Sequence, residues 1–297
     1  MDGNLLYTGT GSSQYINLAR DLSALNCKNE EVSTRDGHVY AYICNVTVHA
    51  SVSGSYAVAA APNTWKMRNA FRKWHAYRDM MFEDAGITES EKGRYGKTIR
   101  PYLDESMKSG TIKTPNGLDL GEWSYTEIAA TPGYKEAGTG TEGGSIVDVY
   151  ELNLCGPNQV SSTSAQGAQR FSAVGMINSY NQDRMEVVTP TAGETVEGLN
   201  NPLALLRYKG AAGGEVMDIA EDLELEAPPY DVGDAKSSID WVIKGITTIT
   251  NNTTAQTRTF HNVVVPAGLM ILTTADADAN ALVHVECVGK VLCKDLA

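Results

Sequence analysis

The chain of 297 residues is poor in the features that mark several common classes of protein. Only 7% of its residues are aromatic, no apolar run approaches the length of a membrane span, and no basic segment followed by an apolar core opens it. We therefore expect neither a signal peptide nor a transmembrane helix, and we expect synthesis in the cytoplasm.

Positive charge is also scarce. Lys and Arg number 24 against 36 Asp and Glu, which gives a formal net charge of -12. A surface of this sign repels phosphate, so we expect little direct nucleic-acid binding. The imbalance is largest between Thr189 and Asp234, where many acidic residues face only Arg207 and Lys209, and we expect much of this stretch at the surface.

Spacings typical of catalytic and metal sites are missing. The five cysteines show no CxxC pair, and an odd number argues against a complete disulfide framework, so we expect buried thiols in a reducing compartment. The five histidines lie singly, without HxH or HExxH spacing. No GxSxG, GxxxxGK(S/T) or helix-opening GxGxxG motif is present. The sequence predicts no catalytic residue, no cofactor site and no metal site, and we expect that the protein is not an enzyme.

One acidic pattern leaves a cation site undecided. Asp276, Asp278 and Asn280 alternate like the first ligands of a calcium loop. Ala281 stands in place of the sharp-turn Gly, however, and Cys287 stands where the last acid of such a loop belongs. We expect a plain hairpin loop at this position.

One long amphipathic helix is encoded from about residue 64 to residue 85. Its apolar residues recur at three- and four-residue steps and share one face: Met67, Ala70, Phe71, Trp74, Tyr77 and Met81. Asn63 or Thr64 is suited to cap its first turn, and Gly86 is suited to end it. The polar face begins basic and ends acidic, against the helix dipole, so we expect a compensating partner. A solvated face, a contact with another subunit and a contact with nucleic acid all stay open.

The rest of the chain is predicted to be an all-β body. Residues 38–62 form two strands around a turn at 53–55, residues 15–22 fit either a strand or a helical turn, and frequent Gly and Pro make residues 87–116 a loop with short helical turns at most. Further strands are expected at 123–130, 145–154, 170–180, 185–188, 204–208, 215–219, 241–250, 257–265, 269–273 and 282–292.

The loosest stretches in the middle of the chain are 138–144 and 156–169, and the second is the better candidate for a domain boundary. We therefore expect residues 1–160 to form a first half, with a helical insertion at 62–116. Residues 161–297 then form a second half.

Three parts of the sequence resemble the major capsid proteins of small tailless icosahedral single-stranded DNA viruses, bacteriophages in particular. They are YINLARDLSALN followed by GHVYAYICNVTV, the strand-to-helix passage at Ala61–Trp74, and the closing segment at 263–292. Finnlakevirus-like phages are the nearest family by this resemblance.

The resemblance implies a jelly-roll β-sandwich, a double jelly roll for phages of this type, with a single jelly roll as the alternative. It implies self-assembly as trimers, with other capsid proteins, into an icosahedral shell around the genome, and a location in the virion after synthesis in the host cytoplasm. The first 35 residues depart from many single-roll capsid proteins, because their only basic residues are Arg20, Lys28 and Arg35. An internal membrane or a small basic genome-binding protein is therefore expected beneath the shell. Between subunits, we expect the basic half of the helix to meet the acids of 215–234.

Two other classes stay open. A carbohydrate-binding or glycoside-processing β-sandwich would place aromatic rings and paired acids along a groove, for which Trp123, Trp241 and the pair Glu221 and Asp222 are available. A viral spike or receptor-binding protein would usually carry repeats or a stalk, and the sequence has no repeat of fixed period.

Overall fold

A computed structural model gives the fold of the chain. The residues that it describes are 2–50, 52–88, 90–93, 98–110, 112–119, 123–129, 149–161, 170–185, 241–250, 256–275 and 280–296. The strands predicted at 204–208 and 215–219, the acidic stretch up to Asp234, and the residues Asp276 and Asp278 lie outside the described part, as does the side chain of Asn280.

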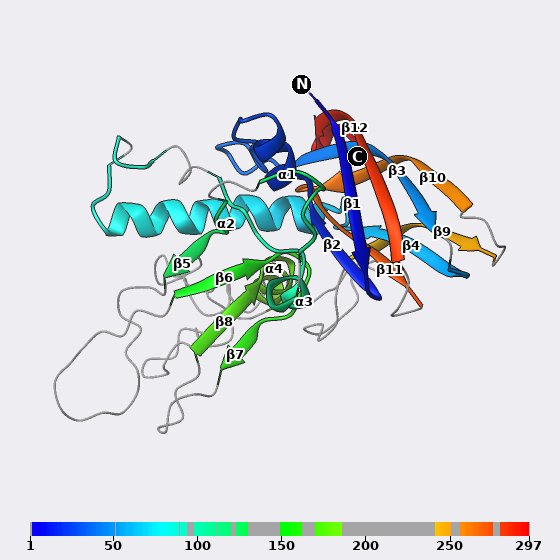
Figure 1. Cartoon of the computed structure of the whole chain (residues 1–297). Helices are drawn as coiled ribbons and strands as arrows, with labels where there is room; N and C mark the ends of the chain where they lie inside the picture. Colours follow the sequence, from blue (N-terminus) through cyan, green and yellow to red (C-terminus); the bar gives the residue numbers. More distant parts are fainter. Residues whose placement is uncertain are drawn as a thin grey trace.

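Two four-stranded antiparallel sheets form the body of the protein (Figure 1). Sheet A contains, in spatial order, β1 (Asn4–Thr10), β12 (Asn280–Leu292), β3 (Tyr40–Ala50) and β10 (Gln256–Pro266). Sheet B contains β2 (Ser13–Asn17), β11 (Leu269–Thr274), β4 (Gly54–Ala60) and β9 (Val242–Ile249). This arrangement agrees with the predicted all-β sandwich.

Alternation along the strands explains why the two sheets share a core. Cys44, Val46 and Val48 of β3 are fully buried, while the residues between them are partly exposed. Tyr56 and Val58 of β4 are also fully buried and belong to the same hydrophobic cluster. Each sheet therefore contributes its apolar face to one core.

Each of the two sheets combines strands from both ends of the chain. In sheet A, β1 and β3 pair with β12, and in sheet B, β2 and β4 pair with β11. The paired strands lie on both sides of the predicted division between residues 1–160 and 161–297. The division itself stays a prediction.

The long helix is confirmed as α2 (Trp65–Asp84), which runs outward from the two sheets in Figure 1. Thr64 caps it, because its hydroxyl accepts a hydrogen bond from the Met67 N–H at 3.2 Å. Gly86 ends it in the left-handed region, with φ of 73°. Five of the six residues predicted on the apolar face are fully buried or nearly so, and Met81 is partly buried against the core.

A second group of elements follows α2 in the chain. It contains two helices, α3 (Glu105–Ser109) and α4 (Met176–Met185), and a third sheet, which we call sheet C. The strands of sheet C are, in spatial order, β5 (Glu127–Ala129), β6 (Val149–Asn153), β8 (Arg170–Gly175) and β7 (Gln159–Ser161). Helix α4 packs on α2, where the rings of Trp65 and Tyr180 meet edge to face at 6.2 Å.

The strand predicted at 170–180 is wrong over its second half. The strand β8 ends at Gly175, and the chain continues as α4. Met176, Ile177 and Ser179 are buried in that helix. Asn178, Asn181 and Asp183 belong to residue types that are depleted in strands, and as a helix this segment packs against α2.

The N-terminal stretch at 15–22 contains both of the structures that fit it. Strand β2 ends at Asn17, whose side chain caps helix α1 (Leu18–Leu25) by accepting from the Arg20 N–H at 3.1 Å.

No helix of the described residues is long and apolar enough to span a membrane.

Candidate functional site

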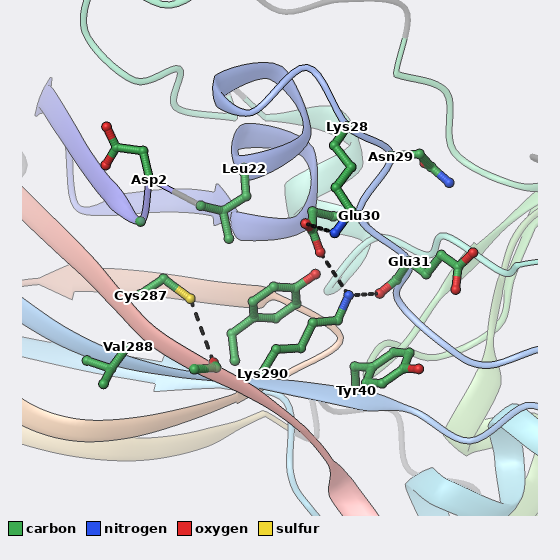
Figure 2. Close-up of a pocket in the computed structure, with 13 residues that line it drawn as sticks. Asp2, Leu22, Lys28, Asn29, Glu30, Glu31, Tyr40, Cys287, Val288 and Lys290 are labelled. Atoms are coloured by element: carbon green, nitrogen blue, oxygen red, sulfur yellow. Dashed lines mark hydrogen bonds and ion pairs between the residues drawn. The ribbon is translucent and has the colours of Figure 1, made fainter.

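A pocket of about 490 Å³ lies between sheet A and the loop that follows α1 (Figure 2). We call it the lysine pocket, because Lys290 of β12 crosses it. The Lys290 ammonium lies 2.9 Å from Glu30 Oε2, donates to the Glu31 carbonyl at 2.7 Å, and stands 4.4 Å from the centre of the Tyr40 ring. These contacts already satisfy the ammonium, so the pocket is not built to bind an anion through Lys290.

Two other polar groups of the lysine pocket are buried. Glu30 is only 3% exposed, and its second oxygen lies 3.5 Å from the Lys28 ammonium. The Tyr42 hydroxyl is buried without a hydrogen-bond partner, and burial raises the pKa of Tyr42 well above its usual value. The pocket ties the loop after α1 to β12 across 260 positions of sequence.

Ser33 and His75 resemble a catalytic pair, but their chemistry argues against this role. Ser33 Oγ lies 2.9 Å from His75 Nε2, and Arg78 donates to His75 Nδ1 at 3.3 Å. Because a guanidinium only donates, Nδ1 is the acceptor and the ring proton sits on Nε2, facing Ser33. Burial, together with Arg78, lowers the pKa of His75 to about 3. A neutral ring in this tautomer cannot accept the serine proton, so the pair links α2 to the loop before β3.

Asp21 is the centre of a buried polar cluster. The Tyr7 hydroxyl donates to Asp21 Oδ2 at 2.7 Å, and Arg20 Nε donates to Oδ1 at 2.8 Å. Arg20 also donates to the carbonyl of Lys113 at 2.5 Å. Burial raises the pKa of Asp21 to about 6, against the opposing effect of Arg20. The cluster joins β1, α1 and the segment at Lys113.

The histidines do not come together as a metal site. His49 of β3 is bonded to the Thr257 hydroxyl at 2.6 Å, and His284 of β12 lies 3.2 Å from Asn4 Oδ1. Within the part of the chain that the structure describes, no three His, Cys, Asp or Glu side chains converge on a possible metal position.

Exposed apolar side chains lie on β9, which is one of the two edge strands of sheet B among the described residues. Val242, Ile243 and Ile246 are 44%, 50% and 62% exposed. Ile243 and Ile246 lie opposite Ala59 and Ala57 and therefore share one face of the sheet, and we call these two residues the β9 strip. Exposed apolar side chains on an edge strand are typical of a surface that meets another chain. The sequence predicted the strand that contains these residues. It did not predict their exposure, because exposure depends on the position of β9 in the sheet.

Part of the basic half of α2 has its compensating acidic partner within the chain. Lys73 forms an ion pair with Asp183 of α4. The expected pairing with the acids of 215–234 concerns residues outside the described part.

Comparison with protein-family models, with curated proteins and with solved structures finds no match to this chain.

Proposed function

We propose that the protein is a viral major capsid protein whose copies assemble, as trimers, into an icosahedral shell around the genome. The observation that carries this proposal is the order in which the strands of sheets A and B pair.

The strand pairing follows one rule. Along the chain, the first described strand of sheets A and B pairs with the last, the second with the second-last, and so on inward: β1 with β12, β2 with β11, β3 with β10, and β4 with β9. These strands form one long antiparallel ribbon, and the additional pairs β3 with β12 and β4 with β11 roll it into two sheets. A ribbon rolled in this way supports a jelly roll, an architecture of viral capsid and lectin domains.

The same pairing favours a single jelly roll over a double one. Both sheets need strands from before residue 61 and from after residue 241, so neither end of the chain completes a roll alone. In this proposal, the segment between β4 and β9, with α2, sheet C and α4, is an insertion that projects from the roll.

The exposed surfaces fit assembly better than sugar binding. The β9 strip offers apolar side chains to a neighbouring copy. In a closed ring, one surface of each copy meets a different surface of the next copy, so the β9 strip need not pair with itself. Trp123 and Trp241, the residues that would line a sugar groove, are instead partly buried against the core. A capsid protein with a net charge of -12 would also need a basic protein or a membrane between it and the genome.

Light scattering of the purified protein over a range of concentrations tests assembly through the β9 strip. Ile246→Asp should shift the protein toward smaller species, because a carboxylate replaces an apolar side chain at the contact. Val288→Asp is the matched control, since Val288 is 61% exposed on β12 and Ile246 is 62% exposed on β9. Equal loss of assembly in the two variants, or no loss in either, would argue against the β9 strip as the contact.

A further inference from the structure

Cys44 and Cys287 lie directly opposite each other on the two central strands of sheet A. In the pairing of β12 with β3, Val283 lies opposite Val48, Val285 opposite Val46, and Cys287 opposite Cys44. Directly opposed residues on antiparallel strands carry their side chains on the same face. The two thiols therefore stand at the end of the inward-facing row.

The spacing of opposed strands suits a disulfide. Opposed residues of an antiparallel pair have Cα atoms about 4.5–5.5 Å apart. A disulfide accepts Cα distances of about 4.4–6.8 Å. Both cysteines are free thiols in the structure. Because their strands are directly paired, the two Cα atoms are within the range that a disulfide accepts.

The two thiols differ in access. Cys44 is fully buried, whereas Cys287 is partly exposed and lines the lysine pocket (Figure 2). The register of β12 shifts directly after Cys287, and Gly289 becomes the next residue opposite β3. Such a bulge changes the direction of nearby side chains, here among residues that line the lysine pocket.

The thiols also differ in reactivity. A hydrogen bond from Cys44 lowers the pKa of Cys287, while the same hydrogen bond, together with burial, raises the pKa of Cys44. Cys287 is therefore the more readily formed thiolate, and the thiolate is the attacking species in disulfide exchange.

We propose that Cys44 and Cys287 form a redox-active dithiol, in which Cys287 reacts with a small disulfide from the lysine pocket and Cys44 completes an internal disulfide. The Cys287 thiolate attacks one sulfur of the small disulfide, which forms a mixed disulfide and releases one small thiolate. The Cys44 thiol then gives its proton to the released small thiolate and attacks Cys287 Sγ, which releases the second small thiolate, and this thiolate takes up a proton from water. Two protein thiols are oxidised, and one small disulfide is reduced to two thiols.

The product would link β3 to β12 covalently, and so join the first part of the chain to its last strand. A chain made with free thiols would form this covalent link between β3 and β12 once it is exposed to a medium that contains small disulfides.

Oxidised glutathione is the probe, and non-reducing peptide mapping by mass spectrometry is the readout. Cys27 is exposed, so Cys27→Ser is the parent protein for all samples. The folded parent should lose two free thiols and yield one cross-linked peptide pair that contains Cys44 and Cys287. Cys44→Ser should stop at one glutathione adduct on Cys287, and Cys287→Ser should give neither product.

Cys293→Ser is the matched control, because Cys293 is buried elsewhere in the core, and it should behave as the parent does. Cys44→Ala provides a second variant in case a buried serine hydroxyl lowers the melting temperature. A folded parent whose Cys287 stays unmodified would overturn the proposal. A glutathione adduct on Cys287 that persists in the presence of Cys44 would do the same.

Discussion

The indole N–H of Trp74 donates a hydrogen bond to the backbone carbonyl of Met176 at 3.3 Å. This bond connects the middle of α2 to the first residue of α4 across 102 positions of sequence. The Trp74 ring also meets the rings of Tyr77 and Tyr150 edge to face, with centroids 5.5 and 6.5 Å away. Trp74 therefore fixes α2, α4 and sheet C to one another.

Trp74→Ala should lower the free energy of unfolding by about 3–5 kcal/mol, because it removes a fully buried aromatic side chain and leaves a cavity. Denaturant unfolding followed by circular dichroism measures the change. Arg72→Ala, on the exposed face of the same helix, is the control and should change the stability by less than about 0.5 kcal/mol. Equal stabilities of wild type and Trp74→Ala would mean that this face of α2 is not in the core.

Gly37→Ala should be clearly destabilising for two separate reasons. Gly37 has a φ of 78°, and an added Cβ would lie 2.9 Å from the Arg72 Cα. The left-handed conformation alone costs about 1–2 kcal/mol for a residue with a side chain. Gly86→Ala isolates that cost, because Gly86 has a φ of 73° and open space around its Cα. Thermal melts should show a larger loss for Gly37→Ala, and a smaller loss would contradict the described contact with α2.

Asp21 should make the protein less stable as the pH rises from about 4 to above 6. Burial raises its pKa to about 6 in the folded protein, from an ordinary value of 3.8. In this window the folded protein keeps a proton that the unfolded chain has released, so rising pH favours unfolding. A pKa difference of this size corresponds to roughly 3 kcal/mol at pH 7.

His75 should act with the opposite sign over an overlapping range. Its pKa is lowered from 6.5 to about 3, so the unfolded chain binds a proton that the folded protein excludes, and stability rises with pH through this window. The free energy of unfolding of wild type, Asp21→Asn and His75→Gln, measured between about pH 4 and pH 7, separates the two effects. Relative to wild type, Asp21→Asn should gain stability as the pH rises, and His75→Gln should gain it as the pH falls. Parallel pH profiles for all three proteins would contradict both assignments.

Several elements could be predicted from the sequence because their signals are local. Helix α2 has a cap at Thr64, a 3.6-residue apolar period and Gly86 at its end. Strands β3, β4 and β9 to β12 alternate in polarity or are rich in β-branched residues, and all were predicted within a few residues of their ends. Strand β1 was missed, because only Leu5 and Tyr7 of its short polar sequence face the core.

The long-range contacts behind the two proposals could not be read from local sequence. The pairing of β1 with β12, the contact of Lys290 with Glu30, and the opposition of Cys44 and Cys287 all join residues more than 240 positions apart. Such contacts depend on which strands become neighbours, and neither residue carries a local signal of its partner. The lysine pocket and the cysteine pair were missed for this reason.

Electron microscopy of the purified native assembly tests the central claim most directly. A capsid protein whose copies tile a shell should give closed particles of uniform diameter, and their averaged images should show repeated units that fit trimers. A protein that remains monomeric at high concentration across a series of salt concentrations, with no particles in the images, would contradict the capsid proposal.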